Sequence, residues 1–455
     1  MKTILLFLTV LFFSISVYSQ DITGRWGGML DVSGQKIPVI FNIVKEGSSF
    51  KSTLFSPSLG KDGIPVDSTT LENNKLSLKI TALKAEFSGE LNSDGKFVGT
   101  FSQNGMKFPL TINKGGTVVV DAPKRPQEPK PPFSYYSEDI KFTNPKANIK
   151  LAGTLTLPKK EGKYPVIVMI TGSGPENRNE EIFGHKPFLV IADHLAKNGI
   201  GVLRFDDRGF GESEGTFGTA TSEDFASDVE SAVTYLKTRN DVNLNKIGLI
   251  GHSEGGIIAP MVAANSKDVA FIVLLAGPGI SGYELLPLQG ELINRASGMS
   301  EADALAAKKM SQGAFDIVMK STDQKTLEPD LIAYFKKIGM PENEAVNAAK
   351  QANSPWMQFF LKYDPKTALK KVKVPVLAVN GEKDLQVPAD IDLKEIKETL
   401  ENSGNKNVTI IKFPKLNHLF QECDTGLVSE YGKIEQTFSP IALKEITDWI
   451  VKQTK

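Results

Sequence analysis

This chain has almost no cysteine and no net charge. Its 455 residues include one cysteine, Cys423, so no internal disulfide can form. Lysine and arginine together number 53, as do aspartate and glutamate, and the formal net charge is zero. No basic stretch is long enough to follow a phosphate backbone, which argues against a nucleic-acid partner. The sequence also lacks a P-loop, a dinucleotide-binding fingerprint, a metal-ligand cluster and an internal repeat, so we expect no cofactor and no metal.

Long hydrophobic runs are missing as well, except at the N-terminus. A positive charge precedes an apolar run over residues 4–17, and Val17 and Ser19 are small residues at the −3 and −1 positions of a cleavage site before Gln20. The run is short for a membrane span, and no cysteine follows it that could carry a lipid. We therefore expect residues 1–19 to be a signal peptide and the mature protein to have no membrane span. A disulfide-free exported protein suits a bacterial periplasm or secretion.

Residues 20–120 have the alternating pattern of an all-β domain. Gly, Asn, Asp and Ser separate the short runs, and Asn92-Ser-Asp-Gly95 is a strong hairpin turn. We expect a small antiparallel barrel or a strongly curved sheet, and Gly24-Arg-Trp26 resembles the opening of lipocalin-type barrels. Two roles stay open: a ligand- or surface-binding module, or a domain that packs on the rest of the chain or forms a homodimer, which we favour. The expected strands are Lys36–Val44, Lys75–Ile80, Ala85–Leu91, Lys96–Ser102 and Met106–Ile112.

A proline-rich segment, residues 121–133, is typical of a stiff, extended linker. Beyond it, residues 134–455 alternate between apolar strands and helices, which predicts a doubly wound, mostly parallel α/β sheet behind an antiparallel opening hairpin. About ninety residues, 281–370, interrupt this rhythm with helical patterns, and because a crossover needs only about a dozen residues we expect a helical lid. The hairpin strands are Tyr135–Phe142 and Ile149–Leu157, and the core strands are Val166–Ile170, Gly201–Phe205, Ile247–Ile250, Ala270–Leu275, Val374–Val379 and Val408–Phe413.

The most informative motif is Gly251-His-Ser-Glu-Gly255. An apolar strand that ends at Ile250 precedes it, and a helix follows. The two glycines allow a tight strand-to-helix turn with Ser253 at its apex, exposed to a substrate and close to the positive end of the helix dipole. A plain glycine-rich turn is the alternative, but the flanking strand and helix favour a nucleophilic serine.

Such a serine needs a histidine base, and the chain has four histidines. His252 adjoins the serine and points in a different direction, His194 lies in an upstream helix, and His185 lies in a loop before that helix. His418 follows an apolar strand downstream of the serine, as the chain order Ser, Asp, His requires. We therefore predict His418 as the base, with a surface-loop histidine as the alternative.

The acid should follow a strand between the serine and this histidine. Val374–Val379 has the continuous apolar pattern of a strand buried on both faces, and a glycine turn leads from it to Asp384. Asp384 would accept the Nδ1 proton of His418 and fix its tautomer. Glu382 and Asp390 are rivals, but the first lies very close to the strand end and the second resembles a helix N-terminal residue.

These three segments resemble the nucleophile elbow, acid loop and histidine loop of the α/β-hydrolase superfamily. Met169–Pro175 stands where those enzymes have their oxyanion loop, and Phe205–Ser213 resembles their D-x-R-G-x-G-x-S loop, which implies a scaffolding role for Asp207 and Arg208. The resemblance covers about residues 135–455. It is strongest to bacterial carboxylesterases of the serine-aminopeptidase-like and dienelactone-hydrolase-like kinds, which carry a small β domain ahead of the catalytic one.

The oxyanion loop departs from the family pattern, because Thr171-Gly172 stands where His-Gly is usual. We expect the backbone amides of Ser173 and Glu254 to be the oxyanion donors. The end of the predicted lid is unusually aromatic. Its Trp356, Phe359 and Phe360 either pack the lid onto the core or line an acyl pocket as substrate-binding residues.

The sequence thus predicts an exported serine hydrolase, best interpreted as a carboxylesterase for short- to medium-chain acyl esters. The alternative is a serine peptidase, either an aminopeptidase or a proline-specific enzyme, in which Glu176, Glu180 and Glu181 could bind an α-amine. About a hundred β residues are too few for the propeller of a prolyl oligopeptidase. A further alternative, a non-catalytic binding protein led by the β domain, is disfavoured by the complete triad.

Overall fold

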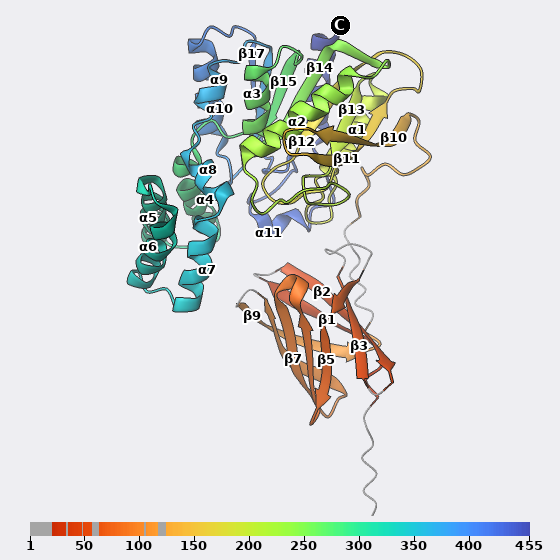
Figure 1. The fold of residues 1–455 in the computed structure, drawn as a ribbon, viewed down its shortest axis with the longest axis vertical. Helices are drawn as coiled ribbons and strands as arrows, with labels where there is room; N and C mark the ends of the chain where they lie inside the picture. Colours follow the sequence, from red (N-terminus) through yellow and green to blue (C-terminus); the bar gives the residue numbers. More distant parts are fainter. Residues whose placement is uncertain (1–20, 33–34, 48, 57–62, 104–105, 117–123) are drawn as a thin grey trace, which may run out of the picture. The chain divides into compact units, whose positions relative to one another are not determined.

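The computed structural model describes residues 21–455, apart from 33–34, 48, 57–62, 104–105 and 117–123 (Figure 1). The predicted signal peptide lies outside the described residues. The chain divides into two compact units, Met1–Val120 and Asp121–Lys455, which are taken separately below. Within the described residues, no helix combines the length and the apolar character needed to cross a membrane.

The first unit is a nine-stranded antiparallel sheet in the order β4-β3-β2-β1-β9-β8-β7-β6-β5. The ends of the sheet approach each other, since Thr69 Oγ1 on β5 donates a hydrogen bond of 2.8 Å to Ser52 Oγ on β3. The prediction of a barrel-like all-β domain is therefore confirmed. The strands are β1 (Gly24–Val32), β2 (Gln35–Glu46), β3 (Ser49–Phe55), β4 (Ile64–Val66), β5 (Ser68–Glu72), β6 (Lys75–Ile80), β7 (Ala85–Leu91), β8 (Lys96–Gln103) and β9 (Met106–Lys114).

Large side chains fill the interior of this sheet. On β6 every second residue is buried, as a strand with one inward face requires. The ring centroids of Trp26 and Phe97 are 4.8 Å apart, and those of Phe41 and Phe87 are 5.9 Å apart. These four rings are all nearly or fully buried, so packed side chains occupy the space in which wider barrels hold a ligand.

The described part of the predicted linker makes hydrogen bonds within the second unit. Gln127 accepts hydrogen bonds from the amides of Thr437 and Phe438 and donates one to the carbonyl of Phe438. These contacts were not predicted, because the guanidinium and the carboxamide find backbone partners far away in the sequence. Arg125 donates hydrogen bonds to four backbone carbonyls, those of Phe183, Gly184, Gly432 and Ile434.

The second unit contains an eight-stranded sheet in the order β10-β11-β13-β12-β14-β15-β16-β17. The hairpin β10–β11 is antiparallel to its neighbours, and the pairs from β13 to β17 are parallel. The predicted doubly wound, mostly parallel sheet is confirmed. Its strands are β10 (Tyr136–Asn144), β11 (Ile149–Leu157), β12 (Tyr164–Ile170), β13 (Gly201–Phe205), β14 (Val242–His252), β15 (Phe271–Leu275), β16 (Val376–Gly381) and β17 (Val408–Phe413).

Helices cover both faces of this sheet, which explains why its central strands, such as β12 and β15, are continuous apolar runs. On β12, Val166 and Val168 face the core with α2 and α3, whereas Ile167 and Met169 face the core with α1 and α12. The helices outside the insertion are α1 (Pro187–Lys197), α2 (Ser222–Lys237), α3 (Gly255–Asn265), α10 (Ala389–Asn402), α11 (Val428–Tyr431) and α12 (Pro440–Thr454).

Six helices separate β15 from β16. Helices α5, α6 and α7 lie to one side of the sheet and its covering helices, and α4 and α8 lie nearer to it (Figure 1). Apolar side chains of α4 and α8, including Leu285 and Phe360, pack with Ile257 at the start of α3. The helices are α4 (Gly282–Ala296), α5 (Glu301–Lys320), α6 (Gln324–Lys337), α7 (Glu342–Ala352), α8 (Pro355–Lys362) and α9 (Lys366–Leu369).

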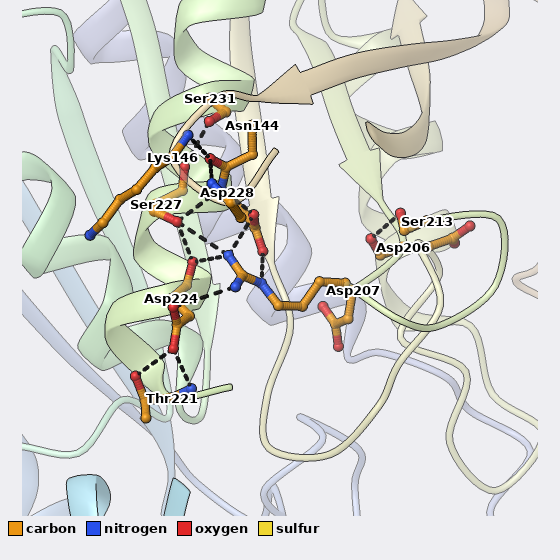
Figure 2. Close-up of polar contacts among 12 residues, drawn as sticks. Asn144, Lys146, Asp206, Asp207, Ser213, Thr221, Asp224, Ser227, Asp228 and Ser231 are labelled. Atoms are coloured by element: carbon orange, nitrogen blue, oxygen red, sulfur yellow. Dashed lines mark hydrogen bonds and ion pairs between the residues drawn. The ribbon is translucent and has the colours of Figure 1, made fainter. Parts of the chain in front are cut away.

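A buried ion pair holds the loop after β13 in place (Figure 2). Nε and Nη2 of Arg208 donate to the two carboxylate oxygens of Asp228 at 2.7 and 2.9 Å, and Nη2 also donates to the backbone carbonyl of Asp224. Asn144 at the end of β10 donates to Asp228 and to Ser227. A bidentate pair of this kind fixes orientation as well as distance, so the hairpin, the loop and α2 form one rigid support.

Candidate active site

Ser253 stands in the turn between β14 and α3. Its φ is +53°, in the left-handed region that side-chain-bearing residues rarely adopt. The motif glycines are required for space, because a side-chain carbon on Gly251 would lie 1.9 Å from the carbonyl oxygen of Gly255, and one on Gly255 would lie 2.3 Å from that of Ile170. The turn therefore has the strained strand-to-helix geometry that presents a nucleophilic serine.

His418 and Asp384 form the hydrogen-bonded pair that a base and its orienting acid require. Nδ1 of His418 lies 2.7 Å from Oδ2 of Asp384, and both residues are buried. The other carboxylate oxygen accepts hydrogen bonds from the amides of Gln386 and Val387, at 2.8 and 2.9 Å, which holds Asp384 in one orientation. The backbone amides and the histidine together satisfy this carboxylate without solvent.

The two rivals for the acid lie elsewhere. Glu382 accepts a hydrogen bond from the amide of Lys415, and the exposed Asp390 pairs with Lys412 at 2.6 Å. Neither carboxylate contacts the imidazole of His418 in the described part of the chain. A short turn after the strand is enough to point Asp384 at the histidine and Glu382 away from it.

Ser253 and His418 line the same pocket, whose volume is about 200 Å³. Among the described residues, neither Oγ of Ser253 nor Nε2 of His418 has a hydrogen-bond partner, so both atoms are free to meet a substrate. Catalytic hydrogen bonds are often long before substrate binds. The pocket is also lined by Gly172, Ser173, Glu176, Glu180, Ile182, His252, Pro278, Leu285, Leu286, Gln289, Trp356, Phe360, Gln386, Val387 and Leu419.

The loop after β12 lies against the nucleophile. A side-chain carbon on Gly172 would lie 3.4 Å from Cβ of Ser253. The amide of Gly172 already donates to Oε1 of Glu180 at 3.1 Å. By contrast, the amides of Ser173 and Glu254 donate to no acceptor among the residues that the structure describes, which leaves both available for an oxyanion.

Asp207 ties the oxyanion loop to the loop after β13. Its two carboxylate oxygens accept hydrogen bonds from Oγ1 of Thr171, at 2.7 Å, and from the amide of Glu176, at 2.9 Å. Burial raises the pKa of Asp207 to about 8, although these hydrogen bonds oppose the rise. The contacts are those of a scaffold residue that fixes both ends of the oxyanion loop.

The aromatic residues of α8 divide between two faces of the helix. Trp356 and Phe360 are four residues apart, stack with ring centroids 4.9 Å apart, and line the pocket of Ser253. Phe359 does not line it, which corrects the prediction for this residue. It stacks on Tyr363 at 5.4 Å and lines a separate cavity with Met261, because one helix position turns a side chain by roughly 100°.

Two polar residues of the elbow have contacts that the sequence interpretation missed. The carboxylate of Glu254 is buried and accepts hydrogen bonds from Oγ of Ser222, at 2.5 Å, and from Nε1 of Trp356, at 2.8 and 2.9 Å to its two oxygens. The ring of His252 lies between Glu180 and the main chain of His418. One signal in the sequence could have predicted these contacts. A histidine and a glutamate stand inside a motif that has to be buried, and each buried polar side chain needs a hydrogen-bond partner.

The three glutamates considered for an α-amine differ in their surroundings. Glu181 lies within 4.0 Å of Lys186 on the surface and does not line the pocket. Glu180 lines it, but its Oε1 is occupied by His252 and Gly172. Glu176 also lines the pocket, and its Oε2 is buried without a hydrogen-bond partner among the described residues. Burial and the nearby carboxylates raise the pKa of Glu176 well above its usual value.

Comparison with known proteins adds a family and several relatives. The family model described as X-Pro dipeptidyl-peptidase (S15 family) matches residues 147–393. The chain is 28% identical to Esterase EstD of Thermotoga maritima, over 70% of this chain and 69% of that protein. It is 26% identical to the bifunctional esterase/perhydrolase DCH of Acinetobacter calcoaceticus, over 49% of this chain and 76% of that protein.

Among solved structures, the chain is similar to the Pyrococcus furiosus esterase Pf2001, with a TM-score of 0.44 and 18% identity over 70% of this chain and 91% of that one.

Proposed function

The chain belongs to the X-Pro dipeptidyl-peptidase (S15) family. From its esterase relatives, the geometry of the pocket and the N-terminal apolar run, we propose that it is an exported carboxylesterase with the triad Ser253, His418 and Asp384. It is a serine hydrolase with the α/β-hydrolase fold. The observation that carries the proposal is the hydrogen bond between His418 and Asp384 in a pocket that also holds the strained elbow serine.

In the proposed reaction, Oγ of Ser253 attacks the ester carbonyl carbon while Nε2 of His418 takes the hydroxyl proton. Asp384 stabilises the imidazolium that forms, and the amides of Ser173 and Glu254 donate to the tetrahedral oxyanion. The imidazolium then gives its proton to the departing alkoxide, which leaves as the alcohol. A water molecule, deprotonated by the same histidine, attacks the acyl-enzyme and releases the carboxylic acid and free Ser253.

The size of the pocket supports a short acyl group. About 200 Å³ is below the roughly 300–1,000 Å³ typical of sites for drug-sized ligands. Leu285, Val387, Trp356 and Phe360 supply apolar walls that would bury acyl carbons. We propose acyl chains of short to medium length on this basis.

Replacing the nucleophile tests the proposal directly. Ser253→Ala should lower kcat for p-nitrophenyl acetate by about 10⁴-fold or more, as loss of a triad member typically does. The melting temperature should not fall, since a hydroxyl without a protein partner does not support the core. A fluorophosphonate should label wild-type Ser253 and leave the variant unlabelled. More than a tenth of the wild-type activity in Ser253→Ala would show that another residue is the nucleophile.

A serine peptidase remains the second candidate, and Glu176 is the observation in its favour. A substrate ammonium group would meet the unpartnered, buried Oε2 of Glu176 at the pocket wall. The name of the family points to peptides with a proline in the second position. If this candidate holds, wild type should cleave aminoacyl or aminoacyl-prolyl anilides faster than p-nitrophenyl acetate. Glu176→Gln should then raise KM for the anilides and leave KM for the acetate unchanged.

Export rests on the N-terminal apolar run and can be tested separately. Expressed in a bacterium with its full N-terminus, the protein should appear in the periplasm or the medium with Gln20 as its first residue. Recovery of the uncut chain from the cytoplasm would contradict it.

A further inference from the structure

A buried histidine next to the nucleophile bridges the two loops that surround it. The ring of His252 is 6% exposed, its Nδ1 lies 2.8 Å from Oε1 of Glu180, and its Nε2 lies 3.0 Å from the backbone oxygen of His418. The rings of His252 and His418 are 4.8 Å apart between centroids. The residue before the nucleophile therefore contacts both the residue that anchors the oxyanion loop and the main chain of the base.

The partners of His252 determine its protonation. A backbone carbonyl oxygen only accepts hydrogen bonds, so Nε2 must carry a proton. Oε1 of Glu180 accepts a hydrogen bond from the amide of Gly172 and also lies 2.8 Å from Nδ1 of the ring. Burial opposes a charge on His252, but Glu180 and the carbonyl of His418 outweigh it and raise the pKa of His252 above its usual value. The two contacts thus hold the ring at both nitrogens, one on the oxyanion-loop side and one on the base-loop side.

Glu180 is itself held in an unusual backbone conformation. Its φ is +52°, its side chain is 2% exposed, and its amide donates to the carbonyl of Asn177 in a tight turn. A non-glycine residue is strained in this region of φ and persists there only where its surroundings impose it. Here the turn directs the carboxylate inward, to Gly172 on one side and to His252 on the other.

We infer that the Glu180–His252 pair is a positioning pair for the reaction, which sets the distance between the oxyanion loop and the base on either side of Ser253. The inference rests on the triad proposed above. The order of contacts is Gly172 amide, Glu180 carboxylate, His252 ring and His418 main chain, and the ring is attached to the residue next to the nucleophile. Loss of either side chain would let the base loop and the oxyanion loop move independently of Ser253.

Two variants test the pair, with a third as a matched control. His252→Gln removes the two-ended ring, and Glu180→Gln removes the charge but leaves an oxygen for the amide of Gly172. His185 is the control, because it is also buried and bonds through both ring nitrogens, to Thr437, to the carbonyl of Tyr431 and to Gln421, and makes no direct contact with the triad within the described residues. kcat and KM for p-nitrophenyl acetate and the melting temperature are measured on the full chain for each.

A positioning role predicts a loss in kcat rather than in binding. Displacing reacting groups by about 1 Å can cost about 10²-fold, so kcat of His252→Gln should fall by up to about that factor with KM within about three-fold of wild type. The kcat of Glu180→Gln should also fall. The kcat of the double variant should be no lower than that of the slower single variant, since the two side chains act as one unit. His185→Gln should lose stability without a comparable loss in kcat.

Each other outcome overturns the inference or its premise. If His252→Gln and Glu180→Gln keep kcat within about three-fold of wild type, the pair has only a structural role. If His185→Gln loses as much kcat as His252→Gln at a similar melting temperature, general loosening explains both. If His252→Gln does not fold, the kcat of Glu180→Gln alone decides whether the pair has a positioning role, because this substitution keeps the shape of the side chain. If a fluorophosphonate fails to label wild-type Ser253, the triad itself is wrong, and the inference fails with it.

Discussion

Trp356 should have two separable effects, one on stability and one on acyl selectivity. Its indole N–H donates to both oxygens of the buried Glu254 carboxylate, while its ring stacks on Phe360 and lines the pocket. Trp356→Phe removes the donor and keeps an aromatic wall. Trp356→Ala removes both.

The magnitudes follow from these contacts. Leaving a buried hydrogen-bond acceptor without its donor costs about 1–3 kcal/mol, so Trp356→Phe should lower the free energy of unfolding by about that amount. Burial of one methylene contributes roughly 0.8 kcal/mol, so in wild type each added acyl carbon should raise kcat/KM about four-fold until the pocket is full. Trp356→Phe should keep most of this preference. Trp356→Ala should flatten it and change acetate turnover least.

The assay is a series of p-nitrophenyl esters from acetate to hexanoate, with denaturant unfolding of the same preparations. Phe359→Ala is the matched control, because Phe359 lies on the same helix but faces a different cavity. It should leave the ratio of butyrate to acetate turnover unchanged. If Trp356→Ala lowers turnover of all acyl lengths in parallel, the ring does not form the acyl wall and the reasoning is refuted.

Three further predictions concern the proposed base His418, the buried carboxyl group of Asp392 and the segment before β10 that contains Arg125 and Gln127. His418→Ala should lower kcat for p-nitrophenyl acetate about as much as Ser253→Ala does, because members of a triad act as one unit; a variant that keeps more than a tenth of the wild-type kcat would exclude His418 as the base. Burial raises the pKa of Asp392 from 3.8 to about 7, so this residue should contribute a loss of roughly 4 kcal/mol of stability as pH rises from about 4 to 7, because the unfolded state ionises first. Denaturant unfolding across this pH range should show a smaller loss of stability for Asp392→Asn than for wild type. An equal loss would show that the pKa of Asp392 is not raised in the folded protein. A chain shortened to begin at Lys124 should keep p-nitrophenyl acetate turnover, whereas one that begins at Ser134 should melt at a lower temperature because it lacks the anchoring Arg125 and Gln127; equal melting temperatures would contradict this.

Features set by short-range sequence could be predicted. The strand before Gly251, the two glycines and the helix after them leave one backbone solution for the elbow, since a side chain at either glycine would collide with a carbonyl. The apolar runs of the second unit predicted its parallel strands, because strands buried on both faces have no polar positions. The proximity of Asp384 and His418 could be predicted because each follows a mainly apolar strand, and the carboxyl ends of parallel strands meet at one edge of a sheet. The signal peptide stays a prediction from its apolar run.

Contacts between distant segments were decided only by the tertiary structure. Phe359 and Phe360 are neighbours with the same hydrophobicity, and only the packing of α8 on the elbow decides which of them reaches the pocket. Nothing local to Arg125 predicts that its guanidinium binds carbonyls about 300 residues further on. The same holds for Glu180 and His252, whose pairing spans 72 residues. A side chain's own sequence neighbours specify its backbone conformation, whereas its partner is whichever group the packed sheet, loops and helices bring within hydrogen-bonding distance.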